Sequence, residues 1–271
     1  MNIITKGLKY FFLAFLLLII LGNVWGYLTL GTLTPELGAV RDKTANQVVM
    51  VFGATGSVGD GLLKAAMEDE EVNEIHVVTR RSSPRIEEGA ASGRLIVHMH
   101  DDFENYDDLR DHLARTNTVL WALGSTSIGM DDETYTWIHV DFPVAFVNEW
   151  LSARRHGPMS FHYIAGMGTD GSAHWALEKS RAERELAELA ADSDLRTFSY
   201  RSGFIRPSTE TANAFHYILE TLLRPGRLVI TSRGLGGAML EISARTSELK
   251  NGTLIDNADS IAYAEAYRSS Q

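Results

Sequence analysis

The sequence contains no cysteine among its 271 residues. This absence excludes a disulfide scaffold, a zinc ribbon, an iron–sulfur cluster and a thiol nucleophile. Positive charge is also scarce, because 25 Lys and Arg face 35 Asp and Glu and leave a formal charge of -10. Such a balance repels a phosphate backbone, so nucleic acid is not an expected partner. The composition is otherwise that of a globular protein, with 45% hydrophobic and 22% charged residues.

Charged side chains are absent from Tyr10 to Pro35, and the stretch from Phe11 to Leu21 is apolar throughout. A helix over residues 10–30 would be about 30 Å long, which is the thickness of the hydrocarbon core of a bilayer. Trp25 and Tyr27 near its end suit the membrane–water interface. This pattern predicts a single-pass membrane anchor, with the membrane as a partner of residues 10–30.

A cleaved signal peptide is the alternative interpretation of the same segment. Lys6 and Lys9 would then be its positive start, and Gly22–Gly26 would be the cleavage region with small residues. For an anchor, Lys6 and Lys9 on one side are matched by Arg41 and Lys43 on the other, so the positive-inside rule does not fix the orientation. The glycine-rich segment Gly53–Gly59, which is typical of nucleotide-binding proteins, favours the cytosolic face for the soluble part, because the main nucleotide pools lie there.

From Gln47 onward, short β-branched runs alternate with helical segments, which is typical of a parallel sheet covered by helices. We expect an anchor or signal segment at 1–33, a linker at 34–46, and an α/β, doubly wound, Rossmann-like domain at 47–265 with a small C-terminal cap from about residue 201. Six strands are predicted, at 47–52, 75–79, 94–99, 118–123, 160–165 and 196–200. Helices are predicted at 58–68, 106–114, 134–153, 174–190, 214–223 and 236–245.

A glycine-rich turn follows the first predicted strand directly. Its sequence, Gly53-Ala54-Thr55-Gly56-Ser57-Val58-Gly59, has the spacing G-x-x-G-x-x-G between a strand and a helix. Glycines are needed there because the turn is tight and the backbone must approach a pyrophosphate closely. The helix that begins at this turn offers free N–H groups to the anion. The turn therefore predicts dinucleotide binding by Gly53, Thr55, Gly56, Ser57, Val58 and Gly59.

The end of the second predicted strand indicates which dinucleotide is bound. It reads Thr79-Arg80-Arg81-Ser82-Ser83, without the carboxylate that usually binds the 2′-hydroxyl of NAD. Arg80 and Arg81 suit the 2′-phosphate of NADP, so NADP is favoured and NAD is the alternative. After the third strand, Asp101 is placed where it can contact adenine. After the fourth, Leu123 and Gly124 are expected beside the nicotinamide ribose.

Taken in order, these residues resemble the atypical short-chain dehydrogenase/reductase family, in the branch of NmrA-like and epimerase/dehydratase-like proteins. The resemblance extends from about Gln47 to Ala262. Besides the glycine-rich turn and the two arginines, it rests on the segments Trp121–Gly124, Tyr163–Asp170, Trp175–Lys179 and Arg201–Pro207. It implies a nicotinamide cofactor and, in the active members, a Tyr-x-x-x-Lys pair with a serine at the preceding strand end.

The catalytic positions depart from that pattern. Lys179 matches the lysine, but Trp175 stands in place of the tyrosine, and the serine position falls at Ala165 or Gly166. Tryptophan has no proton to exchange at neutral pH, and loss of general acid–base catalysis costs roughly 10²- to 10⁴-fold in rate. The resemblance thus implies that Lys179 and Trp175 lie at the nicotinamide. It leaves three functions open: a hydride-transferring oxidoreductase, a non-catalytic dinucleotide sensor or scaffold, and an epimerase or dehydratase.

Other constellations of chemistry-bearing residues are weak. The nine histidines form neither H-x-x-x-H nor H-E-x-x-H, and His98 with His100 is only a same-face pair on a strand, so no metal site is predicted. A G-x-S-x-G elbow is absent, which argues against a serine hydrolase. His162 and Tyr163 must point to opposite faces of their strand, and we expect both to be buried with satisfied hydrogen bonds.

Overall fold

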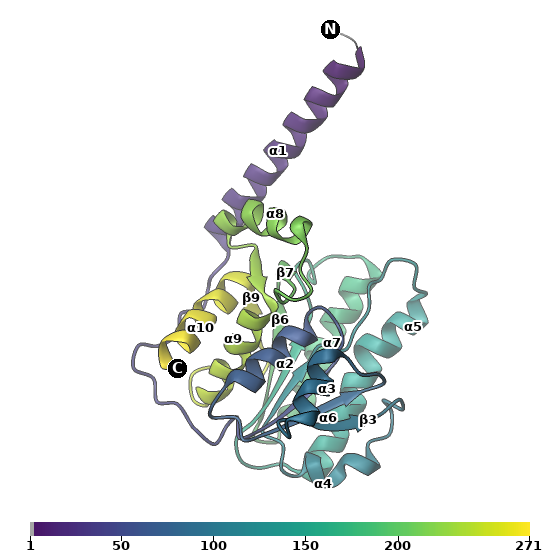
Figure 1. Ribbon diagram of the computed structural model, residues 1–271, viewed down its shortest axis with the longest axis vertical. Coiled ribbons are helices and arrows are strands. Elements are labelled where there is room, and N and C mark those ends of the chain that lie inside the picture. Colours follow the sequence, from purple (N-terminus) through teal and green to yellow (C-terminus); the bar gives the residue numbers. More distant parts are fainter. Residues whose placement is uncertain (1–2) are drawn as a thin grey trace.

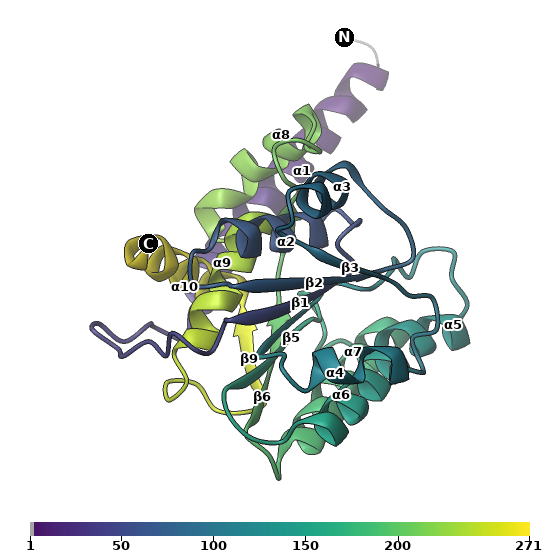
Figure 2. The ribbon, with the colours of Figure 1, turned by 60° about the horizontal axis from the view of Figure 1, so that its bottom comes forward.

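The structure is a computed structural model that describes the backbone of residues 3–271 and the side chains of residues 9–271. Seven parallel strands form the central sheet, in the order β3-β2-β1-β4-β5-β6-β9 (Figure 2). The chain runs outward from β1 to β3, returns to β4 and then runs outward on the other side, which confirms the doubly wound, Rossmann-like fold. The strands are β1 Val48–Phe52, β2 Glu74–Thr79, β3 Ile96–Met99, β4 Thr118–Trp121, β5 Met159–Ile164, β6 Leu195–Arg201 and β9 Thr253–Asp256.

Helices cover both faces of this sheet (Figure 1). Alternate residues of β1 enter two separate cores: Val49 and Val51 belong to one, and Met50 and Phe52 to the other. Burial on both faces explains why the strand has a continuous apolar run. One layer consists of α2 Gly59–Glu68, α3 Pro84–Ala91, α9 Ser232–Ala244 and α10 Asn257–Ser270. The other consists of η1 Asp107–Leu109, α4 Arg110–Leu113, α5 Asp132–Thr136, η2 Trp137–Asp141, α6 Phe142–Ala153 and α7 His174–Ala190.

For the central sheet, the prediction of six strands was wrong by one. The seventh strand, β9, contributes a single fully buried residue, Ile255, so its sequence lacks a recognisable apolar run. The helix predicted at 134–153 is divided into α5, the π-helical turn η2 and α6. Pro143 lies in the first turn of α6, where its missing N–H is tolerated.

Residues 201–265 divide between the main sheet and a small outer group of elements. The outer group is a second, two-stranded parallel sheet with a helix and a 3₁₀ turn: β7 Phe204–Arg206, α8 Ala214–Leu223, η3 Arg224–Gly226 and β8 Val229–Thr231. The chain then returns to the domain through α9, β9 and α10. Asp256 ends β9 and caps α10, since its side chain accepts hydrogen bonds from the backbone N–H groups of Ala258 and Asp259.

The N-terminal helix α1 (Ile3–Thr29) projects from the domain as a single rod (Figure 1). By length and composition, its stretch Lys9–Thr29 is apolar enough to cross a membrane, and a signal sequence near an N-terminus passes the same test. Most of its described side chains are exposed, including Phe11 and Leu18.

The C-terminal end of α1 is docked on the domain through polar contacts. The Asn23 side chain donates to the carbonyl oxygen of Leu222 at 2.9 Å and accepts from the N–H of Gly226 at 2.6 Å. Arg227 donates to the carbonyl oxygens of Tyr27 and Leu30, at 2.6 and 2.8 Å. These carbonyls are ones that the end of the helix leaves without intrahelical partners, so Arg227 caps α1.

The segment predicted as a linker, residues 34–46, is irregular but lies against α9. The N–H of Asp42 donates to the carbonyl oxygen of Ala244 at 2.8 Å, and Arg41 forms an ion pair with Glu241 at 3.0 Å. Asn46 is buried and donates to the carbonyl oxygen of Leu240 at 2.8 Å. The connection between α1 and β1 is therefore held to the domain at several points.

Candidate functional site

The glycine-rich turn lies between β1 and α2, and at two of its positions, Gly53 and Gly59, a Cβ would collide with neighbouring backbone atoms. Gly53 has a φ of +71°, and a Cβ there would come within 2.7 Å of the backbone nitrogen of Leu123. A Cβ on Gly59 would lie 2.6 Å from the carbonyl carbon of Gly53. The strands that follow β1 are added on one side of it, and those that follow β4 are added on the other side of the sheet. The turn after β1 therefore stands at the topological switch point, where open α/β folds bind ligands.

A cavity of about 360 Å³ opens beside this turn. It brings together seven residues that the sequence predicts for the cofactor, namely Gly53, Thr55, Gly56, Arg80, Arg81, Leu123 and Gly124. Of the other lining residues, Thr79 and Ala122 belong to the two strand-end segments that the sequence predicts beside the cofactor, whereas sequence reasoning missed Val78 and Phe103. The two missed residues are apolar, and nothing in their local sequence marks them as binding residues.

The remaining predicted cofactor residues lie outside this lining. Ser57, Val58 and Gly59 lead into α2, and Val58 occupies the N-cap position without a side-chain hydrogen bond to the helix. Asp101 is exposed beyond the end of β3 and does not line the cavity. Phe103, two residues later, turns inward and takes the place on the wall that was expected for Asp101.

Two guanidinium groups follow the end of β2. Arg81 is held near the turn, because its Nε donates to the Thr55 hydroxyl at 3.3 Å. The Thr79 hydroxyl in turn donates to the carbonyl oxygen of Arg81 at 2.7 Å. Arg80 is exposed at the rim. Among the described residues that line the cavity, none is a carboxylate, so this end of it is positively charged.

Lys179 is buried on α7 below the end of β5. Its Nζ donates to the carbonyl oxygen of Ile164 at 2.9 Å and lies 4.7 Å from the centre of the Tyr163 ring. Burial lowers the pKa of Lys179 to about 7, opposed by the nearby charge of Glu183. One helical turn earlier, Trp175 packs beside Gly168, where a Cβ would lie 3.3 Å from the indole ring.

The position at which the sequence resemblance places a serine, Ala165 or Gly166, holds no hydroxyl. Ala165 is buried and Gly166 has a φ of +104°, a conformation that suits glycine. The nearby hydroxyl of Thr169 donates to the carbonyl oxygen of Gly166 at 2.7 Å. The Thr169 hydroxyl is therefore engaged in the β5–α7 loop.

Two aromatic residues missed by sequence reasoning face this region from α5 and η2. The imidazole Nε2 of His139 lies 3.0 Å from the carbonyl oxygen of Ser125, and a Cβ on Gly124 would lie 2.8 Å from its Cε1. Burial, with the charge of Lys179 as the smaller cause, lowers the pKa of His139 to about 3. The Tyr135 ring lies 4.2 Å from that of His139, and burial raises its pKa to about 12. The spacing Tyr-x-x-x-His, which places both side chains on one face of a helix, was the sequence signal that could have identified this pair.

The prediction for His162 and Tyr163 is confirmed. His162 is fully buried and hydrogen-bonded to the hydroxyls of Tyr200 and Ser243, at 2.8 and 2.7 Å. Tyr163 points to the opposite core and donates to the carbonyl oxygen of His139 at 2.8 Å. Neither is free to serve as a proton donor to a ligand.

Comparisons with known proteins agree with this fold. No known family profile matches the chain. The "Leucinostatins biosynthesis cluster protein T" of Purpureocillium lilacinum is 23% identical over 177 residues, which is 64% of this chain and 64% of that protein, less than two thirds of its length. Among solved structures, the enoyl-[acyl-carrier-protein] reductase (NADH) of Aquifex aeolicus VF5 superposes with a TM-score of 0.60 at 13% identity, over 81% of this chain and 98% of that one.

A further solved structure is the UDP-N-acetylglucosamine 4-epimerase of Methanobrevibacter ruminantium M1, with a TM-score of 0.56 at 14% identity, over 78% of this chain and 76% of that one. The chain therefore has a Rossmann fold of the kind found in short-chain dehydrogenases/reductases and in nucleotide-sugar epimerases. At these identities the likeness establishes the fold, and the activity must be argued from the site.

Proposed function

We propose that this protein is a membrane-anchored, NADP-binding oxidoreductase-like protein of the atypical short-chain type. Its chemistry would be hydride transfer at a carbonyl or hydroxyl carbon of a small molecule. The observation that carries the proposal is the cavity at the switch point, which has a glycine cradle on one side, Arg80 and Arg81 on another and no described carboxylate in its lining.

The chain's own residues suit a nicotinamide dinucleotide. The close approach of Gly53 and Gly59 leaves the N-terminus of α2 open for a pyrophosphate. Arg80 and Arg81 would bind the 2′-phosphate, and Lys179 would exchange the carbonyl of Ile164 for ribose hydroxyls. When bound, the cofactor supplies or accepts the hydride. Trp175 would cover the nicotinamide end without moving a proton.

A second candidate function is a non-catalytic dinucleotide sensor. It is favoured because the described side chains near Lys179 are poorly suited to exchange a proton with a substrate. Trp175 replaces the tyrosine, and the pKa of about 3 keeps His139 neutral at physiological pH. Burial also raises the pKa of Tyr135 to about 12, away from the value that suits acid–base catalysis. The oxidoreductase and the sensor share the cofactor and differ in turnover.

The cofactor is tested by measuring the binding of NADPH and NADH to the full chain in detergent. Arg80→Asp should weaken the binding of NADPH by roughly 10- to 100-fold, since hydrogen bonds to a charged group contribute about 1.5–3 kcal/mol. The affinity for NADH should change little. Arg155→Asp, at an exposed site, makes the same change of charge and is the control. Equal losses for both cofactors would contradict the choice of NADP, and no binding of either would contradict the proposed function.

Retention of α1 as an anchor is supported by its docking. Cleavage within Gly22–Gly26 would remove the contacts of Asn23 with Leu222 and Gly226. Removing α1 would also uncover the tight crossing at Gly26, where a Cβ would lie 2.9 Å from the Leu228 side chain. We expect the mature protein to keep its N-terminal segment and to resist carbonate extraction from membranes. A mature chain that begins after Gly26, identified by mass spectrometry, would instead establish a signal peptide.

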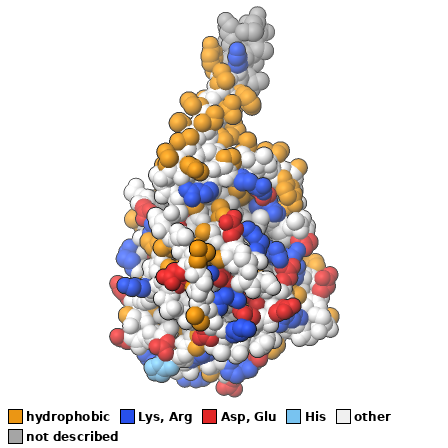
Figure 3. Space-filling model, turned by 90° about the vertical axis from the view of Figure 1, so that its left-hand side faces the viewer, with side chains coloured by type: hydrophobic (Ala, Val, Ile, Leu, Met, Phe, Trp, Pro, Cys, Tyr) orange, Lys and Arg blue, Asp and Glu red, His pale blue; other side chains and the backbone are white. Residues whose placement is uncertain are grey.

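The surface beside α1 fits the same proposal. Hydrophobic side chains cover the exposed part of α1 and continue onto the adjoining top of the domain (Figure 3). There α8 has no buried residue and exposes Phe215, Tyr217 and Ile218. Aromatic and aliphatic side chains on a helix next to a membrane span suit the headgroup region of a bilayer. In this arrangement α8 rests on the membrane surface.

A further inference from the structure

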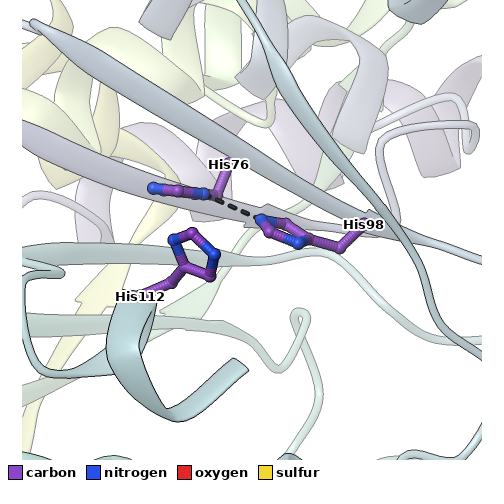
Figure 4. A group of neighbouring side chains, drawn as sticks. All are labelled: His76, His98 and His112. Carbon is purple, nitrogen blue, oxygen red and sulfur yellow. Dashed lines mark hydrogen bonds between the residues drawn. The ribbon is translucent and has the colours of Figure 1, made fainter. Parts of the chain in front are cut away.

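Three histidines that are far apart in the sequence converge on one face of the sheet (Figure 4). His76 lies on β2, His98 on the edge strand β3 and His112 on the short helix α4. The register of the sheet places Val78 beside His98 and His76 beside Ile96, so the two histidine side chains share a face two residues apart. Helix α4 covers that face and adds the third imidazole.

The three rings form a nearly regular triangle. Their centres are 5.1 Å apart for His76 and His98, and 4.7 Å apart for the two pairs that include His112. One ring nitrogen of each residue lies within 4.8 Å of those of the other two. Nδ1 of His76 and Nε2 of His98 are 2.8 Å apart. Two imidazoles on one tetrahedral ion would have nitrogens about 3.3 Å apart, because each metal–nitrogen bond is about 2.0–2.1 Å. Small side-chain movements reach that spacing.

Glu74 provides the support that metal-binding histidines usually have. Its carboxylate accepts a hydrogen bond from Nε2 of His76 at 2.6 Å and is held by two hydrogen bonds from Arg115, at 3.0 and 2.8 Å. A proton on Nε2 leaves Nδ1 of His76 with its lone pair directed toward the other two histidines. Carboxylates in this outer position fix the tautomer and increase the basicity of a ligating imidazole.

Burial favours the neutral, metal-binding form of two of these imidazoles, those of His76 and His98. Burial is the main cause that lowers the pKa of His98, to about 4, and burial lowers the pKa of His76 as well. His76 is fully buried, whereas His98 and His112 are partly exposed, so an ion can enter from the solvent side.

We infer that His76, His98 and His112 form a binding site for one divalent transition metal ion of the zinc type, with water completing a tetrahedral shell. Three imidazoles without a thiolate suit Zn²⁺, Cu²⁺ or Ni²⁺ and disfavour Mg²⁺ and Ca²⁺, which prefer oxygen ligands. The sequence alone predicts no metal site because its three ligands come from separate elements and form no local motif.

None of the three histidines lines the dinucleotide cavity, although the two sites are neighbours, because the cavity residue Val78 is the register partner of His98. A bound ion would tie the edge strand β3 and the helix α4 to β2. Because β3 has four residues and only one neighbouring strand, we assign the ion a stabilising role in the fold rather than a catalytic one.

The test uses the full chain in detergent, freed of any affinity tag that contains histidine. Titration with ZnCl₂ should give saturable binding of one ion per chain and a higher unfolding temperature, and Co²⁺ should give the visible absorption of a tetrahedral complex. His112→Gln, at a partly exposed ligand, should abolish that absorption. Glu74→Gln should weaken Zn²⁺ binding by about 10- to 100-fold. His156→Gln, whose side chain is 86% exposed beside Asp194, should bind as the wild type does.

Folding of each variant is checked in metal-free buffer by its circular dichroism spectrum and unfolding temperature. If a variant at the buried His76 fails to fold, the variants at His112 and Glu74 still decide the question. Absence of saturable Zn²⁺ binding to the wild type would overturn the proposal. So would equal affinity and stoichiometry in the wild type and His112→Gln.

Discussion

Replacement of Gly59 by alanine has two opposing effects on stability: it improves helix propensity, and it overpacks the glycine-rich turn. Gly59 is the first residue of α2, and Ala is favoured over Gly in helices by roughly 0.5–1 kcal/mol. A Cβ there would lie 2.6 Å from the carbonyl carbon of Gly53 and 3.0 Å from the backbone nitrogen of Ala54. Ordinary carbon contacts are about 3.5–4.0 Å, so the start of α2 must move away by about 1 Å.

Overpacking of this kind costs about 1–3 kcal/mol, which exceeds the gain in propensity and leaves a net loss of roughly 1–2 kcal/mol. For a domain of this size, that loss lowers the unfolding temperature by about 5 °C. Displacement of α2 should also weaken the binding of NADPH, because in the proposed complex the N-terminus of α2 would face the pyrophosphate. Gly56→Ala is the matched control for stability. A Cβ on Gly56 would approach the Gly53 oxygen only to 3.2 Å, so the unfolding temperature should fall less than in Gly59→Ala. A higher unfolding temperature for Gly59→Ala with unchanged NADPH affinity, by circular dichroism and fluorescence titration, would refute the reasoning.

Three further outcomes are expected. Trp175→Tyr should raise NADPH oxidation against a panel of carbonyl compounds above the wild-type level; a gain over a wild type that binds NADPH without turnover supports the sensor, and no gain contradicts the placing of Trp175 at the tyrosine position. Lys179→Met should be more stable than the wild type near pH 7. The difference in the free energy of unfolding should narrow by about 4 kcal/mol toward pH 10.5, because the unfolded wild type binds more protons than the folded wild type over that range. A difference that stays constant with pH in urea denaturation contradicts the lowered pKa of Lys179. The absence of native cysteine allows single labelling: an environment-sensitive dye on Phe215→Cys should shift to the blue in vesicles, unlike one on Leu177→Cys, which is 53% exposed on α7.

The parts of the fold that were predictable have strong local signals. The glycine turn follows an apolar strand directly, and α7 begins and ends at the predicted residues 174 and 190 because its charged and apolar residues recur at helical spacing. β9 was missed because only Ile255 is fully buried in it. The short helix α3 was missed because it buries only Ile86 and Gly89.

The candidate site was predictable only for residues that directly follow the ends of predicted strands. Arg80 and Arg81 continue a strand that is adjacent to the turn, so their place in the cavity follows from the topology. His139 reaches the neighbourhood of Lys179 through the π-helical turn η2, which the sequence does not indicate. The histidine triangle depends on the pairing register of β2 with β3 and on the packing of α4. Both are tertiary features, and local periodicity carries no information about them.

The docked end of α1 bears on the proposed membrane anchoring. After α1, the N–H of Gly31 donates to Asp256 at 2.8 Å, and the N–H of Leu33 donates to Asp259 at 2.7 Å. Asp256 ends β9 and caps α10, so these hydrogen bonds hold the segment that follows α1 to the edge of the sheet. With Arg227 capping α1 from the other side, the helix has a fixed direction relative to the strands. If α1 is the membrane anchor that we propose, a domain held in this way does not tumble on a flexible tether, and the cavity keeps one height and orientation above the bilayer.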